Sequence, residues 1–195
     1  MPETKHLTEM ERSLDMLVAP PRQRVSRMTA LTLTDTWQTI SFIEGSSAFN
    51  LNSFPQSRWD YTTNKLKINP DNTLEQSYLL SFDYSLTNVI NQSKVQMRFV
   101  IPAPTPIYFP FPDDTEPYLD LCQLFMPGTL KQNFIYPIYG NTSMRNYGVQ
   151  IQMRVVSYVP TANILSGVIS LLTTVLSGTN RVILNNCSLN IYSQS

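Results

Sequence analysis

The stretch VQMRFV at residues 95–100 alternates apolar with polar side chains, and it returns almost unchanged as IQMRVV at residues 151–156. Successive side chains of an extended chain point to opposite faces. Glutamine and arginine therefore share one face of each stretch and the apolar side chains share the other, which is typical of antiparallel strands that bury one face. We interpret the echo as two strands of one sandwich rather than as a true repeat, and Arg98 and Arg154 are candidates to line one exposed sheet.

Segments of the same character lie on both sides of these two. Runs that alternate, or that are rich in β-branched and aromatic residues, predict strands at residues 31–34, 37–42, 58–68, 77–87, 94–101, 133–139, 147–159 and 181–192. Turn-forming clusters separate many of them, at residues 45–47, 69–72, 88–93, 140–143 and 177–180. Because strand follows strand with little helix between, the pattern predicts an all-β antiparallel sandwich over residues 31–195.

Two segments depart from this alternation. Residues 101–117 carry six prolines, more than a central strand tolerates, so this stretch is expected to be a rigid extended loop or an edge segment. Its aromatic side chains need burial, either over an open end of the sandwich or against another subunit, and we assign Tyr108, Phe109 and Phe111 to a subunit interface. Residues 164–176 follow helical spacing, with a strand as the alternative because of their β-branched content.

The N-terminal segment has a helical period instead. Spacings of three and four residues line up Leu7, Met10, Leu14 and Leu17 on one face of a short helix, which Pro20 and Pro21 end. So short a helix is marginal alone, so its apolar stripe needs a partner: its own sandwich, sister arms or a different protein. Residues 1–30 are therefore expected to form a helical arm and a basic linker, in which Arg22, Arg24 and Arg27 could lie across an acidic partner.

Composition limits the class of partner. The 195 residues include only 14% charged side chains, and 14 basic residues balance 14 acidic ones. A chain without net charge has no global field to hold nucleic acid, so we do not expect this chain to package a genome. Cys122 and Cys187 lack metal-ligand spacing and are better read as small buried residues than as a disulfide. No signal-peptide pattern and no run of roughly 20 apolar residues occurs, so we expect a soluble chain that makes no membrane contact.

Catalytic motifs are missing from the sequence. The only histidine is His6, in the predicted arm, so a histidine-based nucleophile relay in the sandwich has no base. The carboxylates between residues 113 and 120 match no calcium loop and are expected to be a solvated acidic loop. A glycan hydrolase would need only two carboxylates, but nothing selects a pair. We therefore expect no enzyme activity, no metal and no cofactor.

The order of several segments resembles the compact jelly roll of the tumour-necrosis-factor/C1q type. The resemblance covers residues 31–195 and rests on the runs TWQTISF (36–42), RWDY (58–61), SYLLSFDY (77–84) and KVQMRF (94–99). Two features depart from that type: Gln76-Ser77 stands where a glycine is expected, and the predicted helix near residue 170 is extra. The resemblance implies a jelly-roll sandwich in which an early strand, a Tyr-Asp segment and a Tyr-x-Leu-x-Phe strand succeed one another.

An N-terminal arm on a near-neutral jelly roll rich in Asn and Thr is similar to bacteriophage virion proteins of the head decoration, cement or head-fibre type. This resemblance implies a homotrimer in the virion, assembled in the host cytoplasm, whose arm and linker anchor it to the major capsid or another virion protein. The alternative is a receptor- or glycan-binding head domain of a viral fibre or tail, with loop Tyr and Asn side chains contacting sugars.

Overall fold

The structure is a computed structural model that describes residues 20–43, 51–68, 77–88, 93–109, 118–124, 128–157 and 182–194. Its elements are β1 (Arg22–Arg27), β2 (Leu31–Leu33), β3 (Gln38–Thr39), β4 (Leu51–Asn52), β5 (Trp59–Asp60), β6 (Lys65–Leu66), β7 (Ser77–Asn88), β8 (Ser93–Ile101), β9 (Ile107–Phe109), β10 (Leu119–Leu124), β11 (Gly128–Tyr139), α2 (Thr142–Tyr147), β12 (Gln150–Ser157) and β13 (Val182–Ser193).

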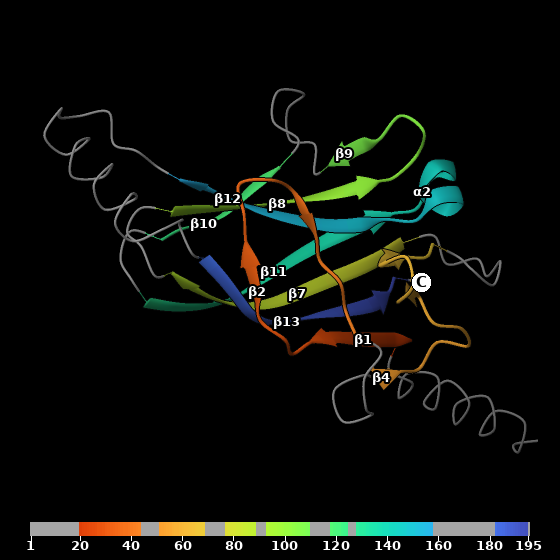
Figure 1. Cartoon of the computed structure of the whole chain (residues 1–195). Helices are drawn as coiled ribbons and strands as arrows, with labels where there is room; N and C mark the ends of the chain where they lie inside the picture. Colours follow the sequence, from red (N-terminus) through yellow and green to blue (C-terminus); the bar gives the residue numbers. More distant parts are fainter. Residues whose placement is uncertain are drawn as a thin grey trace, which may run out of the picture.

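In the described part of the chain, the strands form two facing sheets and one short hairpin, with antiparallel pairing throughout (Figure 1). We call the first sheet A; its order is β11-β7-β13-β1-β4, with β2 also paired to β13. Sheet B has the order β10-β8-β12-β3, and β9 pairs with β8 beyond the end of β10. The all-β antiparallel sandwich expected from the sequence is confirmed.

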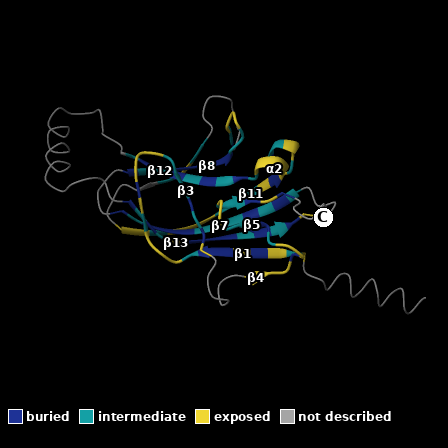
Figure 2. Ribbon diagram, turned by 45° about the vertical axis from the view of Figure 1, so that its right-hand side comes forward, coloured by how far each residue is buried: buried dark blue, intermediate teal, exposed yellow. Residues whose placement is uncertain are grey.

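The core lies between the sheets and follows the period of two in each strand. In β7, Tyr78, Leu80, Phe82, Tyr84 and Leu86 are all buried, while the residues between them are mostly half-buried on the outer face (Figure 2). Strand β13 supplies the neighbouring core positions because its register sets Leu189 opposite Phe82 and Ile191 opposite Leu80. Each such apolar side chain contributes about 1.5–3 kcal/mol when it is fully buried.

The two echoing stretches are neighbours in sheet B. Strands β8 and β12 pair antiparallel, with Met97 opposite Met153 at the centre of the core face. Their glutamines and arginines alternate with these buried residues and so lie on the outer face of the sheet. The expected placement of Arg98 and Arg154 on one sheet face is confirmed.

The expected linker is a strand over residues 22–27. Here β1 lies between β13 and β4, with Gln23 and Val25 buried and Arg22 and Arg24 exposed. The sandwich therefore includes residues before 31, and the expected boundary there is wrong. The physical reason is the same alternation: Val25 fills the core opposite Leu189, and the backbone of β1 satisfies the hydrogen-bonding edge of β13.

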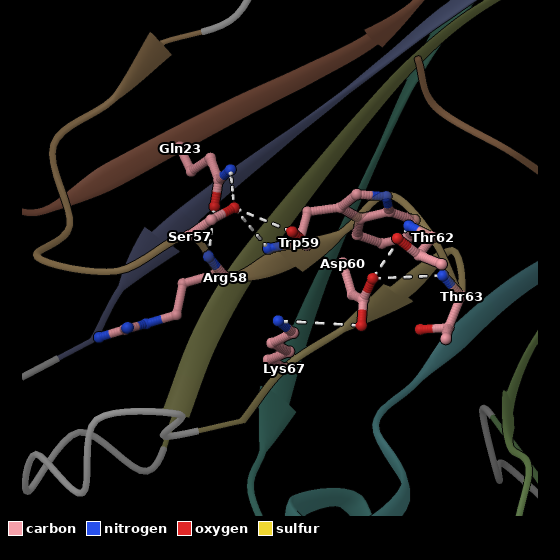
Figure 3. Close-up of polar contacts among 8 residues, drawn as sticks. All are labelled: Gln23, Ser57, Arg58, Trp59, Asp60, Thr62, Thr63 and Lys67. Atoms are coloured by element: carbon pink, nitrogen blue, oxygen red, sulfur yellow. Dashed lines mark hydrogen bonds and ion pairs between the residues drawn. The ribbon is translucent and has the colours of Figure 1, made fainter. Parts of the chain in front are cut away.

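Buried Gln23 also ties β1 to the β5–β6 hairpin, where a single strand was expected over residues 58–68. Its side chain donates to Ser57 Oγ at 2.7 Å and accepts from the Arg58 backbone N–H at 2.6 Å (Figure 3). The hairpin turns through Asn64 at φ 52°. Asp60 accepts from the backbone N–H groups of Thr62 and Thr63 at 2.9 and 3.2 Å, which fixes the turn.

Residues 140–143, expected as a turn, lead into the short helix α2. The Asn141 side chain accepts from the Met144 backbone N–H at 2.8 Å and so caps the helix. Gly148 ends it at φ 72°, where a Cβ atom would lie 2.9 Å from the Leu66 carbonyl oxygen. The predicted arm helix and the helical candidate at residues 164–176 lie outside the described residues.

Candidate functional site

The outer face of sheet B carries a cluster of guanidinium and aromatic groups. The register of β8 and β12 sets Arg98 opposite Gln152 and Arg154 opposite Gln96. Each arginine donates its Nε–H to the Oε1 atom of the glutamine opposite, at 2.9 Å for Arg98 and 2.8 Å for Arg154. These reciprocal hydrogen bonds hold both guanidinium groups in fixed orientations across the two strands.

Three aromatic rings complete this cluster. Trp37, just before β3, lies 4.2 Å from the guanidinium carbon of Arg98 and 4.5 Å from that of Arg154, measured to the ring centroid. Tyr108 of β9 lies 4.1 Å from Arg98, and Tyr118, just before β10, lies 5.5 Å from Arg154. We call these five residues, all of them half-buried, the guanidinium–aromatic cluster. Each guanidinium group contacts two rings: Arg98 contacts Tyr108 and Trp37, and Arg154 contacts Trp37 and Tyr118.

Asp120 lies beside the cluster, but its carboxylate is hydrogen-bonded to residues other than the two arginines. Asp120 accepts from Lys94 Nζ at 2.6 Å and from Gln96 Nε2 at 2.9 Å. Burial alone would raise the pKa of Asp120, but the hydrogen bonds from Lys94 and Gln96 and the charge of Lys94 lower it. Among the described residues, no carboxylate forms an ion pair with Arg98 or Arg154.

The two arginines are therefore close cations with no neutralising partner in the described structure. Burial lowers the pKa of Arg98, the nearby Tyr108 opposes this shift, and the charge of Arg154 adds to it. A guanidinium keeps its proton at physiological pH, so both groups stay charged. Their remaining N–H donors can serve an anion, which is what this arrangement can do chemically.

The outer face of sheet A has a different character. Asp83 accepts from Asn133 Nδ2 at 2.6 Å, from Asn190 Nδ2 at 3.1 Å and from Ser188 Oγ at 3.4 Å. Arg24 donates to the same Ser188 hydroxyl at 3.3 Å. Arg24, Asp83, Asn133 and Ser188 line part of a shallow hollow of about 540 Å³.

Strand β11, at one edge of sheet A, carries exposed apolar side chains. Strand β11 has 12 residues, and of the described strands it pairs only with β7. Ile135 is 59% exposed and Tyr139 is 71% exposed on it. Phe134 and Tyr136, on the opposite face of the strand, pack at the edge of the core. Strand β11 is thus a long edge with an open apolar side.

The residues predicted for partner binding are dispersed. Arg22 and Arg24 are exposed on β1, while Arg27 donates to backbone oxygens of Thr29 and Ser41. Tyr108 belongs to the cluster. Phe109, expected at a subunit interface, is only 2% exposed and stacks on Phe99 at 5.3 Å inside the core, so it is not available to a partner. Phe111 and the arm residues Leu7, Met10, Leu14 and Leu17 lie outside the described residues.

Sequence reasoning placed Arg98 and Arg154 on one face but missed Trp37 and Tyr118. The signal for Trp37 was its position in the alternating run 37–42, which puts it on the face opposite buried Ile40 and Phe42. Tyr118 gave no such signal because it follows the proline-rich segment.

Metal centres and membrane-spanning helices are two further features to consider in the same residues. The described ranges contain no group of three or more His, Cys, Asp and Glu side chains placed to hold a metal ion. No helix in those ranges has the length and apolar character that spanning a membrane requires. Cys122 is half-buried, Cys187 is buried, and both are free thiols.

Comparisons with known proteins give a resemblance in structure only. No protein-family model matches the chain, and no curated protein matches it in sequence. Among solved structures, it is similar to the globular domain of the zebrafish complement 1qA protein, with a TM-score of 0.42 and 11% identity over 88% of this chain and 95% of the other. A likeness at this level transfers nothing about function. The class defined by the strand pairings themselves is an all-β antiparallel sandwich of two sheets.

Proposed function

We propose that the chain is a virion structural protein, of the capsid decoration, cement or head-fibre type, whose sandwich assembles with copies of itself into a closed ring such as a trimer. The observation that carries the assembly part is the exposed edge of β11, with Ile135 and Tyr139 in solvent. The virion part rests on the predicted organisation of the chain, an N-terminal arm ahead of a near-neutral sandwich, which resembles that of phage head proteins.

A long open edge favours association for a physical reason. An edge strand presents unpaired backbone N–H and C=O groups, and proteins usually protect such edges with charge, proline, a bulge or a covering element. Of the 12 residues in β11, Lys131 is charged and Pro137 is a proline, while Ile135 and Tyr139 add apolar surface. The low charge of the whole chain, 14%, suits a permanent subunit contact, whose centre is depleted in charge.

Light scattering of the full chain at micromolar concentration tests the assembly. We expect a mass that is a multiple of 22.3 kDa. The double variant Ile135→Lys and Tyr139→Ser changes only exposed side chains and should return the mass to that of one chain. The matched control Ile43→Lys and Leu51→Ser alters exposed apolar residues beside β1 and on β4, at the edge of sheet A opposite β11, and should leave the assembly unchanged. A monomeric wild-type protein contradicts the proposal.

A second experiment tests the place in the virion. Deleting residues 1–19 leaves β1 complete and should abolish attachment to the particle while the ring still forms. An image of the assembled particle then locates the chain on the shell, in a tail or outside it. Attachment that survives the deletion overturns the anchoring role of the arm, and absence from the particle overturns the virion assignment.

A further inference from the structure

We propose that the guanidinium–aromatic cluster on sheet B is a binding site for a carboxylate-bearing saccharide. This inference goes beyond the assembly role, which uses strand β11 of the other sheet. It rests on two arginines that are oriented by the fold, packed against aromatic rings, and left without a carboxylate among the described residues.

The first step is the orientation of the donors. A guanidinium group has five N–H donors in one plane. The Nε–H of Arg98 is taken by Gln152 and that of Arg154 by Gln96, and both arginine planes pack against Trp37. The terminal N–H groups that remain can bind the two oxygens of a carboxylate side by side. Because the side chains are already held, binding loses little of their rotational freedom.

The second step is charge. Asp120 accepts from Lys94 and Gln96, and Gln96 in turn accepts from Arg154, so this carboxylate bonds directly to neither arginine of the cluster. The positive charges of Arg98 and Arg154 lie against the same Trp37 ring. An anion that binds the outward N–H groups of these arginines, beside that ring, relieves their repulsion. Half-burial reduces screening by water, which strengthens this attraction relative to a fully exposed arginine pair.

The third step is the nature of the rest of the ligand. Tyr108 and Tyr118 flank the arginines and present half-exposed apolar faces, on which the C–H face of a sugar ring can pack. Thr39 and Gln152, joined by a 3.3 Å hydrogen bond, offer polar groups to sugar hydroxyls beside them. A nucleic-acid backbone fits less well, because two arginines and one paired lysine on a chain of zero net charge give few phosphate contacts.

Titration of the full chain with glucuronic acid tests the proposal, with glucose and acetate as comparison ligands. Trp37 reports the binding through its fluorescence, since the other tryptophan, Trp59, is 1% exposed. We expect saturable binding of glucuronic acid and at least tenfold weaker binding of both comparison ligands. Equal binding of acetate overturns the saccharide part, equal binding of glucose overturns the role of the carboxylate, and an absence of saturable binding overturns the whole proposal.

Matched variants distinguish a loss of binding at this cluster from the effects of a changed net charge or of unfolding. Arg98→Gln and Arg154→Gln should each weaken binding at least tenfold, and Arg98→Lys should do so too, because lysine cannot bind a carboxylate side by side. Arg24→Gln makes the same change of charge on sheet A and should leave binding unchanged. Equal weakening by Arg24→Gln contradicts a defined site. Far-ultraviolet circular dichroism verifies that each variant keeps its sheets.

Two other groups could occupy the cluster: a second copy of the chain, or carboxylates of the chain itself. Further measurements on variants distinguish them from a saccharide. If Arg98→Gln lowers the mass measured by light scattering, the face contacts a second copy of the chain and the proposal fails. If binding occurs only after Asp113→Asn, Asp114→Asn and Glu116→Gln are combined, carboxylates of the chain itself hold the arginines, and the saccharide is not their occupant. Retained mass together with binding by the unaltered chain supports the proposal.

Discussion

The guanidinium carbon of Arg98 lies 4.2 Å from the centroid of the Trp37 ring, although Arg98 is in β8, Trp37 precedes β3, and β12 lies between these two strands in sheet B. A cation over an indole contributes about 0.5–2 kcal/mol, depending on how far water is removed. In a double-mutant cycle with Arg98→Gln and Trp37→Leu, we expect a coupling free energy within that range. Urea unfolding measures it. The pair Arg24→Gln and Trp37→Leu, on opposite sheets, should be additive, and additivity at Arg98 as well would show that the stacking adds no stability.

Gly148 should be more sensitive to substitution than Gly128. The backbone of Gly148 has φ 72°, and a Cβ there would lie 2.9 Å from the Leu66 carbonyl oxygen, whereas a Cβ on Gly128 meets nothing within 4 Å. Gly148→Ala should lower the free energy of unfolding by about 1–3 kcal/mol or more, because it combines an unfavourable φ with a clash. Gly128→Ala is the control and should change it by less than about 0.5 kcal/mol. Similar losses at both positions would contradict the conformation of Gly148.

Truncation of Leu189 should strongly destabilise the sandwich. Leu189 is fully buried between Phe82 and Val25 in the ladder of sheet A. Leu189→Ala removes buried methyl groups and leaves a cavity, so a loss of about 2–5 kcal/mol is expected in urea unfolding. Leu51→Ala is the same substitution at a position that is 47% exposed, and its effect should lie within about 0.5 kcal/mol. A small effect at residue 189 would overturn the assigned register of β13.

The thiols should be unreactive in the folded protein. Burial raises the pKa of Cys122 to about 11 and that of Cys187 to about 12, against an ordinary value of 9.0. Since the thiolate is the reactive form, iodoacetamide at pH 8 should leave both residues unmodified until urea exposes them. Mass spectrometry counts the adducts. A labelled native chain would show that the thiols are more accessible than the sandwich allows.

The same shifts predict a loss of stability in alkali. A thiol in the unfolded chain loses its proton near pH 9, whereas the folded chain retains both protons until about pH 11 or above. The unfolded state therefore binds fewer protons, so the free energy of unfolding falls as the pH rises from about 9 to about 11. Urea unfolding at several pH values measures this fall. Cys122→Ala combined with Cys187→Ala should reduce the slope, and an unchanged slope would assign it to other groups such as Tyr84.

Much of the sandwich could be predicted from periodicity, because alternation in β7, β8 and β13 reports burial of one face directly. The strand at residues 22–27 was missed since Pro20, Pro21 and three arginines suggested a solvated linker. Its alternation is visible only once Gln23 is allowed to be a buried residue, and Gln23 is buried because Ser57 and Arg58 supply its hydrogen bonds.

The candidate site could be predicted in part for a related reason. The echo of residues 95–100 and 151–156 placed two arginines on one face, because strand period is a local property. The aromatic partners come from β9, from the turn before β10 and from the edge by β3, so their meeting depends on strand order, which no local pattern encodes. The prediction that Phe109 lies at a subunit interface was wrong because a local pattern was overlooked. Phe109 alternates with Tyr108 in β9, so only one of the two side chains can face outward.

Strand β13 lies between β7 and β1 although it follows Asn88 by more than ninety residues. At a translation rate of about 5–20 residues per second, β7 waits roughly 5–20 s and β1 roughly 8–30 s on the ribosome before the strand that joins them is made. During that interval β7 can pair with β11 and β1 with β4, but the strand that joins these two pairs in sheet A is absent. Biosynthesis of this chain should therefore depend on chaperones that shield exposed strands, and its yield in a cell should rise when translation outpaces aggregation.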